Sequence, residues 1–423
     1  MKRILFILTS MYGHVNPNLE LIRRLTESGC EVACICSKKY SEKLKTLGAR
    51  VLLNESPKEA VSDILPDIED GYCRDAQYYA TFNIETAEWQ SIARERVITY
   101  NVGIIERLTD YRPDIVFYDS VAIQGLVYAK KNRIPCICVD SATNLSSTDP
   151  FFYPFYKDVV LCEIDREVRE GYVPEAARDL IMPVDSYINM DRRFEKKFVR
   201  SVSRLAECDP DDLKPERTYV YLSEEMYNAL GGEVSYRYFC GFGINDMVIP
   251  ETKSGVYVSR GTSLTESSME MLRHMYEGAA CECDEVTVSL GGYQGTEING
   301  NDEKVRILRF SRQVEELKRA KVFLCHGGLT GVREAIMCET PMVVYPGNFH
   351  EYQTGCMIEK LGIGVMIQDR KLTFGENSEL REKIRRVMND DYRFYTDNIK
   401  RIKDNVGKTY NEWSKQSLDR ILI

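Results

Sequence analysis

The sequence predicts an α/β protein made of two Rossmann-like domains, each a doubly wound parallel sheet, facing each other across a cleft. Three observations predict this class. Short apolar segments alternate with amphipathic helical segments over the first 140 residues, and the same alternation resumes at Gly255. A stretch with glycines and a proline, residues 241–254, separates the two halves. The length of 423 residues suits two domains of similar size.

The first half supplies the elements of one such sheet. An apolar stripe formed by Leu21, Ile22 and Leu25 and the closing Gly29 predict a helix over Asn16–Ser28. Further helices are expected at Lys38–Leu47 and Ala122–Asn132. The expected strands are Arg3–Thr9, Glu31–Cys36, Arg50–Leu53, Asp114–Tyr118 and Cys136–Asp140, with another at Tyr219–Leu222. Apolar strands that alternate with amphipathic helices indicate a parallel sheet covered on both faces.

The second half repeats the pattern. Its expected strands are Val256–Ser259, Glu285–Leu290, Val305–Arg309, Lys321–Cys325 and Met342–Tyr345, with helices between them. An amphipathic pattern over Tyr410–Leu422 predicts a last helix. The expected division is a first domain over 1–240, a linker over 241–254, a second domain over 255–405 and a terminal helix within 406–423. Ligands of such sheets bind beyond the carboxyl ends of the strands.

Composition narrows the class of function. The net charge of −9 and the pI of about 5.3 argue against a nucleic-acid-binding surface. No apolar run is long enough to span a membrane, and residues 1–9 read as a strand rather than a signal peptide, so a cytoplasmic protein is expected. Two of three Cys-x-Cys pairs, Cys34/Cys36 and Cys136/Cys138, lie in strand-like runs and are interpreted as buried thiols. No metal site is expected, because His and Cys are not arranged as sets of four ligands.

A glycine-rich turn in the second half is suited to bind a diphosphate. His326-Gly327-Gly328 follows the apolar strand Lys321–Cys325, and residues 329–338 read as a helix. Glycines at a strand-to-helix turn allow a close approach by an anion, and the free N–H groups and dipole of the helix N-terminus attract it. Thr330 adds a hydroxyl.

The neighbourhood of this turn resembles the family 1 glycosyltransferases, which include macrolide, plant secondary-metabolite and glucuronosyl transferases. That family reads approximately Trp-x-Pro-Gln, His-Gly-Gly, Glu, Pro and Asp-Gln. This chain has Phe310-Ser311-Arg312-Gln313, His326-Gly327-Gly328, Glu334, Pro346 and His350-Glu351 at matching spacing. Ser259-Arg260-Gly261-Thr262 resembles its Ser-x-Gly-Ser/Thr turn, and Gly13-His14-Val15-Asn16-Pro17 its Gly-His-x-x-Pro start. The resemblance implies the two-domain GT-B fold, with a last helix that crosses back onto the first domain.

The resemblance also implies how a nucleotide sugar binds. Phe310 would stack on the base, and Gln313 and Glu334 would hydrogen-bond the ribose. His326, Gly327, Gly328 and Thr330 would hold the diphosphate, with the turn of Ser259, Gly261 and Thr262 lying beneath it, and His350 and Glu351 would face the sugar. Three positions depart from the pattern. His350-Glu351 replaces Asp-Gln, Gly331 replaces a serine, and Arg260 stands where an aromatic residue or leucine is common.

The catalytic base expected from the same resemblance is His14. Transfer with inversion requires the acceptor hydroxyl to lose a proton, and an imidazole with an ordinary pKa near 6.5 can accept it. Asp119, at the end of the strand that contains Ile115–Tyr118, is the expected partner that orients the imidazole and stabilises its cation. Helix capping is the alternative role for this aspartate.

The acceptor is expected to be a small, largely apolar molecule bound by the first domain. Tyr12 and two aromatic-rich stretches, residues 72–89 with Tyr78 and Phe82, and residues 151–156 with Phe151 and Phe152, are candidate walls. Ordinary core packing is the alternative for both stretches. The basic segment 192–204 is more readily a solvated helix face than a lipid-binding surface.

The sequence therefore predicts a hexosyltransferase that needs no metal or other cofactor, acts as a monomer or homodimer and uses a nucleotide sugar, with UDP favoured over dTDP. Two other functions share this architecture. One is a nucleotide-sugar 2-epimerase, against which the Gly13-His14-x-x-Pro17 start argues. The other is a non-catalytic accessory protein, against which the presence of His14, Asp119, His326 and Glu334 argues.

Overall fold

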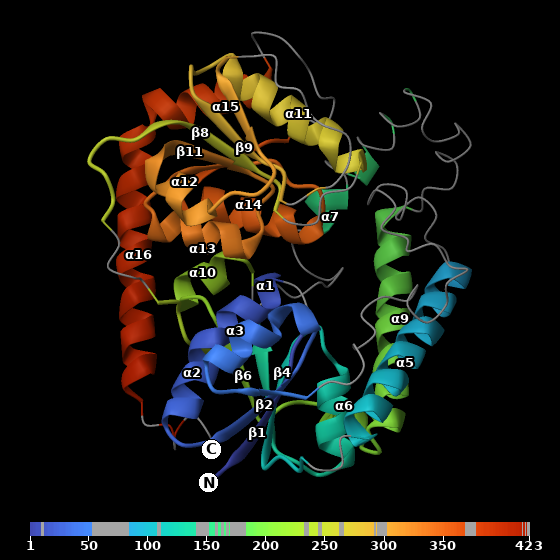
Figure 1. Cartoon of the computed structure of the whole chain (residues 1–423). Helices are drawn as coiled ribbons and strands as arrows, with labels where there is room; N and C mark the ends of the chain where they lie inside the picture. The colour runs from blue at the N-terminus through green and yellow to red at the C-terminus, as the bar shows by residue number, and fades with distance from the viewer. Residues whose placement is uncertain are drawn as a thin grey trace.

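The structure is a computed structural model of the whole chain. It describes residues 1–9, 12–52, 84–107, 111–140, 152–156, 160, 161, 165, 169, 183–231, 237–243, 248–261, 266–291, 293, 303–368, 378–416, 418 and 420. Two parallel sheets lie one above the other in Figure 1, each with helices against its faces. The predicted α/β class with two parallel-sheet domains is confirmed.

The first sheet has seven strands in the order β3-β2-β1-β4-β5-β6-β7. All of its pairings are parallel. Its strands are β1 (Arg3–Ile7), β2 (Glu31–Ile35), β3 (Arg50–Val51), β4 (Ile115–Asp119), β5 (Cys136–Asp140), β6 (Arg217–Val220) and β7 (Arg237–Phe239). The sequence missed β7, and it placed β6 two residues too late. The side chains of β4 and β5 are buried throughout, as expected for strands covered on both faces.

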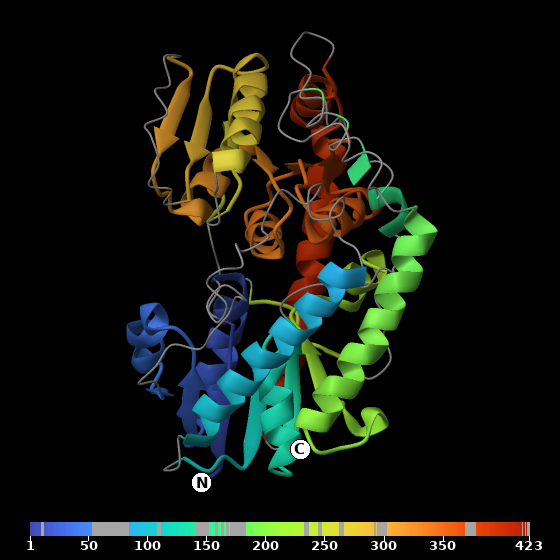
Figure 2. The same cartoon turned by 90° about the vertical axis from the view of Figure 1, so that its right-hand side faces the viewer.

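The helices of residues 1–240 are mostly short, and one of them, α7 (Phe152–Phe155), lies beside the second domain (Figure 1). They are α1 (Tyr12–Val15), α2 (Leu19–Glu27), α3 (Ser41–Thr46), α5 (Ile84–Arg107), α6 (Gln124–Lys131), α7 (Phe152–Phe155), α9 (Val184–Leu205) and α10 (Glu224–Ala229), with 3-10 turns at Asn16–Asn18, Lys38–Tyr40 and Pro210–Asp212. The long helices α5 and α9 lie side by side in both Figures 1 and 2. Ile98 and Val102 of α5 pack on Val202 of α9. Basic residues of α9, among them Arg192 and Arg193, are exposed.

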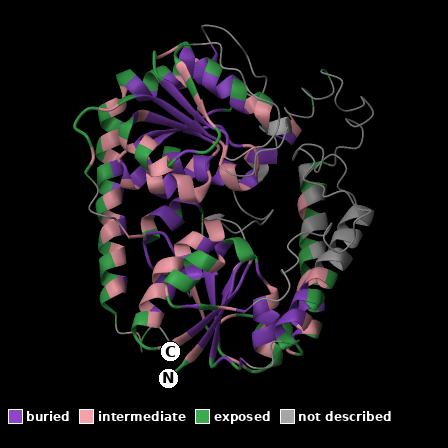
Figure 3. Ribbon diagram, in the orientation of Figure 1, coloured by how far each residue is buried: buried purple, intermediate pink, exposed green. Residues whose placement is uncertain are grey.

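The second sheet has six parallel strands in the order β10-β9-β8-β11-β12-β13. The strands are β8 (Ser254–Ser259), β9 (Val286–Ser289), β10 (Val305–Leu308), β11 (Ala320–Cys325), β12 (Met342–Val344) and β13 (Gly364–Met366). The helices are α11 (Glu266–Ala280), α12 (Gln313–Arg319), α13 (Leu329–Met337), α14 (Phe349–Leu361) and α15 (Glu379–Arg385), followed by a π-helical turn at Arg386–Asp390. Most of the sheet is buried in the domain, whereas the edge strand β10 is only half-buried (Figure 3). The sequence missed β13.

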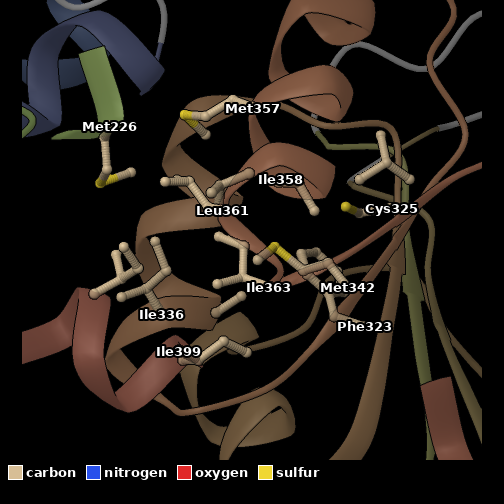
Figure 4. Packing of buried hydrophobic residues seen from close by; sticks show 14 of the residues in the cluster. Met226, Phe323, Cys325, Ile336, Met342, Met357, Ile358, Leu361, Ile363 and Ile399 are labelled. Carbon is tan, nitrogen blue, oxygen red and sulfur yellow. The ribbon is translucent and has the colours of Figure 1, made fainter. Parts of the chain in front are cut away.

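One apolar cluster joins the two domains. Phe323 of β11, Met342 of β12 and Ile358 of α14 belong to it, and Figure 4 shows them close together. Met226 of α10, an element of the first domain, is fully buried in the same cluster. The core of the second domain is therefore completed by a side chain from the first.

The last helix, α16 (Tyr392–Lys415), spans both domains (Figure 1). Ile399, Ile402 and Val406 belong to the cluster that joins the domains, and Trp413 belongs to a cluster of the first domain. The sequence expected a terminal helix over Tyr410–Leu422. The structure instead has one helix that begins at Tyr392 and ends at Lys415, because its buried residues recur at helical spacing from Tyr395 onward.

Candidate active site

The two sheets each have a point where the chain reverses the order in which it adds strands. In the first sheet this point lies between β1 and β4, and in the second between β8 and β11. Ligands of doubly wound sheets bind outside the carboxyl ends of strands at such points. His14 follows β1 and Asp119 ends β4, whereas Ser259 ends β8 and His326 follows β11. The candidate catalytic and donor residues therefore lie at the two switch points.

His14 and Asp119 form a close pair. His14 Nδ1 lies 2.9 Å from both carboxylate oxygens of Asp119. Asp119 is completely buried, and its Oδ1 also accepts hydrogen bonds from Thr9 Oγ1 at 3.3 Å and from the Val121 N–H at 3.0 Å. These bonds fix the carboxylate. With Nδ1 donating to Asp119, Nε2 of a neutral imidazole carries the lone pair that can accept a proton.

A second set of hydrogen bonds holds the backbone of His14. Asn18 Nδ2 donates to the His14 carbonyl at 2.8 Å, and Tyr221 OH donates to Asn18 Oδ1 at 2.9 Å. Asn18 is fully buried, and burial raises the pKa of Tyr221 well above its ordinary value, so its phenol stays protonated as a donor. The sequence analysis missed both residues. The position of Asn18 next to Pro17 at a helix start could have pointed to its role. Nothing in the sequence pointed to Tyr221.

The His326-Gly327-Gly328 turn connects β11 to α13. Gly327 has φ of +96°, and a Cβ there would lie 2.9 Å from Val344 Cγ1 and 3.0 Å from the Glu351 carbonyl oxygen, so glycine is required. Gly328 caps α13 without a side-chain hydrogen bond, which leaves the N–H groups of the first turn available. This is the local geometry that a diphosphate needs.

The imidazole of His326 lies between two glycines. A Cβ on Gly261 would lie 3.0 Å from His326 Cε1, and a Cβ on Gly328 would lie 2.5 Å from His326 Nε2. Burial lowers the pKa of His326 below its ordinary value, and nearby Glu351 and Arg260 act in opposite directions on it. His326 is therefore neutral near pH 7 and offers a hydrogen bond rather than a charge.

The two candidate ribose ligands contact each other. Gln313 Nε2 donates to Glu334 Oε2 at 2.6 Å. Burial raises the pKa of Glu334, and the bond from Gln313 opposes that rise. The ring of Phe310, which precedes α12, is 69% exposed, so a base could stack on it.

The His350-Glu351 pair begins α14. Asn348 Oδ1 accepts from the Glu351 N–H at 3.0 Å, and Glu351 Oε1 accepts from Asn348 Nδ2 at 2.9 Å. Glu351 Oε2 accepts from the Gly347 N–H at 2.5 Å. Glu351 thus completes a capping interaction at its own helix, a role that the sequence analysis did not predict. Burial, and to a lesser extent His14, lower the pKa of His350 to about 4.

The two halves of the site meet at α13. A Cβ on Gly13 would lie 3.2 Å from Thr330 Oγ1, so the loop of the candidate base touches the helix of the diphosphate turn. The described part of the aromatic stretch 151–156 also contacts the second domain. The ring of Phe155 lies 5.2 Å from that of Phe349 and 5.6 Å from that of Tyr352, so this buried residue packs between the domains.

Several predicted site residues lie outside this geometry. Thr262, Tyr78, Phe82 and Phe151 are outside the described residues, and for Tyr12 and Phe152 the structure describes only the backbone. Cys34, Cys36, Cys136 and Cys138 are buried free thiols, as the sequence predicted. Within the described ranges, no cluster of three or more His, Cys, Asp or Glu side chains could hold a metal ion. No helix of the described part of the chain is long and apolar enough to cross a bilayer.

Comparisons with known proteins bear on the fold and on the class of enzyme. The model of the glycosyltransferase family 28 C-terminal domain matches residues 274–410. An uncharacterized UDP-glucosyltransferase, YojK of Bacillus subtilis, is 24% identical over 441 residues, which cover 100% of this chain and 97% of that protein.

Two solved structures share the whole fold. The glycosyltransferase of kitacinnamycin has a TM-score of 0.64 at 18% identity, covering 99% of this chain and 98% of that one. The spinosyn rhamnosyltransferase SpnG, complexed with thymidine diphosphate, has a TM-score of 0.61 at 13% identity and covers 100% of both chains. With the motifs above, these findings show the GT-B fold and support the resemblance of this chain to the family 1 glycosyltransferases, among them UDP-glycosyltransferases and macrolide glycosyltransferases.

Proposed function

We propose that the protein is an inverting glycosyltransferase that moves a hexosyl group from a nucleoside-diphosphate sugar to a hydroxyl of a small, largely apolar acceptor. The observation that carries the proposal is the pair of 2.9 Å contacts between His14 Nδ1 and the buried Asp119. The loop of this pair touches the helix that starts at the diphosphate turn. A base and an anion-binding turn on opposite domains are the two parts that such a transfer needs.

The proposed reaction is a single displacement. Nε2 of His14 takes the proton of the acceptor hydroxyl as its oxygen attacks the anomeric carbon. The bond between that carbon and the diphosphate oxygen breaks, and the nucleoside diphosphate leaves with the electron pair. Asp119 stabilises the imidazolium that forms. A positioned base of this kind contributes a factor of about 10²–10⁴ in rate.

The donor would lie across the carboxyl edge of the second sheet. Phe310 would stack on the base, and Gln313 and Glu334, which are already in contact, would receive the ribose hydroxyls. The uncapped N–H groups of α13 would donate hydrogen bonds to the diphosphate. We propose that these groups stabilise the leaving diphosphate without a metal ion. A uridine donor is favoured over a deoxythymidine donor by its frequency among the resembling transferases alone.

The acceptor is the least defined ligand. The named products of related transferases, kitacinnamycin and spinosyn, are natural products, and this favours an acceptor of that class for this chain. Acceptor and product would exchange with solvent, in keeping with the expected cytoplasmic location.

The experiment that tests the function is a donor titration followed by an acceptor screen. Calorimetry and thermal shift would be run with UDP, dTDP and their glucose conjugates. Saturating ligand at a hundredfold excess over Kd should stabilise the fold by about 3 kcal/mol. The His14→Ala variant should bind the same nucleotide and transfer no sugar. Donor conversion without any acceptor would point to an epimerase, and absence of nucleotide binding to an accessory protein.

A further inference from the structure

Arg260 lies at the switch point of the second sheet, directly after β8 and beside His326. Its Nη1 donates to the Tyr345 carbonyl at 3.2 Å and contacts Met271 Sδ at 2.7 Å. Its Nε is buried without a hydrogen-bond partner. A buried N–H of a guanidinium is costly to leave unpaired, so Arg260 favours a hydrogen-bond acceptor beside it.

Arg260 and Glu351, which both depart from the pattern of the resembling family, approach the same glycine. A Cβ on Gly347 would lie 2.7 Å from Arg260 Nη2 and 3.3 Å from Glu351 Oε2. The guanidinium and the carboxylate therefore lie on one side of this loop. Since a neutral residue is common at each position in that family, this chain has exchanged two neutral groups for a cation and an anion that are neighbours.

The charge at the diphosphate turn comes from Arg260 rather than from His326. The imidazole of His326 is kept neutral by burial, and the positive charge of Arg260 lowers its pKa further. Nδ1 of His326 is buried and unpaired, like Nε of Arg260. His326 lies beside Gly328 at the N-terminus of α13, which has no side-chain cap, and the charge of Arg260 acts on His326.

We propose that Arg260 is a donor-binding and catalytic residue that contacts the diphosphate of the nucleotide sugar, with Glu351 as a neighbouring carboxylate that offsets part of its positive charge. The inference rests on the function proposed above. The diphosphate gains negative charge as its bond to the sugar breaks, and a fixed guanidinium stabilises that charge most in the transition state. Arg260 therefore contributes to both donor affinity and turnover.

The test compares ligands that differ only in phosphate. Calorimetry would measure uridine, UMP and UDP, and thymidine, dTMP and dTDP, on the wild-type chain and on Arg260→Leu, Arg260→Lys and Glu351→Gln. Arg260→Leu should weaken binding of the diphosphate of the preferred series by about 10- to 100-fold, as expected for the loss of a charge-assisted hydrogen bond. The affinity for the nucleoside should stay unchanged. Arg260→Lys should retain part of the affinity. Glu351→Gln should raise the affinity for the diphosphate several-fold, because the variant lacks the carboxylate that opposes the positive charge.

The outcomes separate this inference from the proposed function. Suppose that the wild-type chain binds the diphosphate. If Arg260→Leu binds it with the same affinity, or loses affinity for all three ligands in equal proportion, the role of Arg260 is overturned and the proposed function stands. A wild-type chain that binds no member of either series overturns both. The nucleoside affinity and the melting temperature report whether each variant is folded. If Arg260→Leu does not fold, the opposite effects expected of Arg260→Lys and Glu351→Gln still decide the question.

Discussion

Gly13 and Thr330 face each other across the two domains: a Cβ atom added to Gly13 would lie 3.2 Å from the Thr330 hydroxyl oxygen. This contact links the loop of the candidate base to the helix that follows the diphosphate turn. There is little space between this loop and this helix, so a methyl group at position 13 should push the two apart.

We predict that Gly13→Ala lowers kcat several-fold, since a misplacement of a few tenths of an ångström at a reacting pair is felt in the rate. Removing the Thr330 hydroxyl should relieve the contact, so the double variant Gly13→Ala/Thr330→Ala should be faster than Gly13→Ala alone. Kinetics of the four proteins form a double-mutant cycle with an expected coupling of roughly 0.5–1 kcal/mol. Additive effects of the two changes would mean that the contact has no part in catalysis.

Asp119 should be as important to turnover as the histidine it contacts. Asp119→Asn keeps the shape of the side chain but removes the charge that stabilises the imidazolium, so kcat should fall by about 10²–10⁴. His14→Ala should give a loss of the same size, and the double variant should be no slower than either single one. Nucleotide affinity serves as the control and should stay at the wild-type value in all three. Near-normal turnover of Asp119→Asn would mean that the role of Asp119 is structural, through its hydrogen bond with the Val121 N–H.

Turnover should be independent of added divalent metal. The groups available to the diphosphate are the free N–H groups of α13 and the guanidinium of Arg260, which together supply the positive potential that a metal ion would give. Initial rates in excess chelator should match those in buffer alone. Rates that fall with chelator and return with Mg²⁺ or Mn²⁺ would show that the donor arrives with a metal ion.

Much of the fold follows from local pattern. The apolar runs at Ile115–Asp119 and Ala320–Cys325 are buried strands because parallel sheets covered on both faces need such runs. The three-residue strands Arg237–Phe239 and Gly364–Met366 were missed, whereas the equally short strand Met342–Val344 was found because Pro341 and Pro346 bracket its apolar run. Tertiary packing places Met226 in the core of the other domain, and no local sequence pattern predicts this placement.

The site divides in the same way. The glycine turns and the histidine after β1 could be found in the sequence because tight turns and close approach require specific residues. Glu351 could not be assigned in full, because its capping bonds depend on Asn348 and Gly347 in three dimensions. Tyr221 is more than two hundred residues from Asn18 in sequence, and only the fold of the first domain brings the segment after β6 beside the 3-10 turn Asn16–Asn18.

Acid stability should depend on His350. Its pKa is lowered to about 4 in the folded chain, first by burial and then by His14, against an ordinary value near 6.5. Between pH 6.5 and pH 4 the unfolded chain binds a proton that the folded chain does not, so this residue makes the fold less stable as the pH falls through that window. The slope it contributes is at most about 1.4 kcal/mol per pH unit.

His350→Gln, which cannot be protonated, should therefore lose less stability than the wild-type chain between pH 7 and pH 5. Urea midpoints at several pH values would measure the difference. His14→Ala is the matched comparison, since it removes the second cause and should reduce the slope only in part. Parallel pH profiles for the wild-type chain and His350→Gln would show that His350 is not neutralised by folding.

The end of α16 should couple the two domains through Trp413. Its ring is buried in the first domain, Arg24 lies 4.6 Å above it, and Arg24 Nη2 donates to the Ser414 carbonyl at 2.7 Å. Trp413→Ala should cost about 3–5 kcal/mol at this contact, the usual loss for truncating a buried tryptophan.

Calorimetry of Trp413→Ala should then show the first domain melting at a lower temperature than the second, in a separate transition. Ile399 is buried in the cluster that joins the domains, so Ile399→Ala should lower the melting temperature without splitting the transition. Because catalysis needs His14 and the diphosphate turn on opposite domains, Trp413→Ala should raise the KM for the donor while isolated nucleotide binding persists. A single, equally cooperative transition in Trp413→Ala would show that the cluster containing Met226, rather than the end of α16, is what couples the domains.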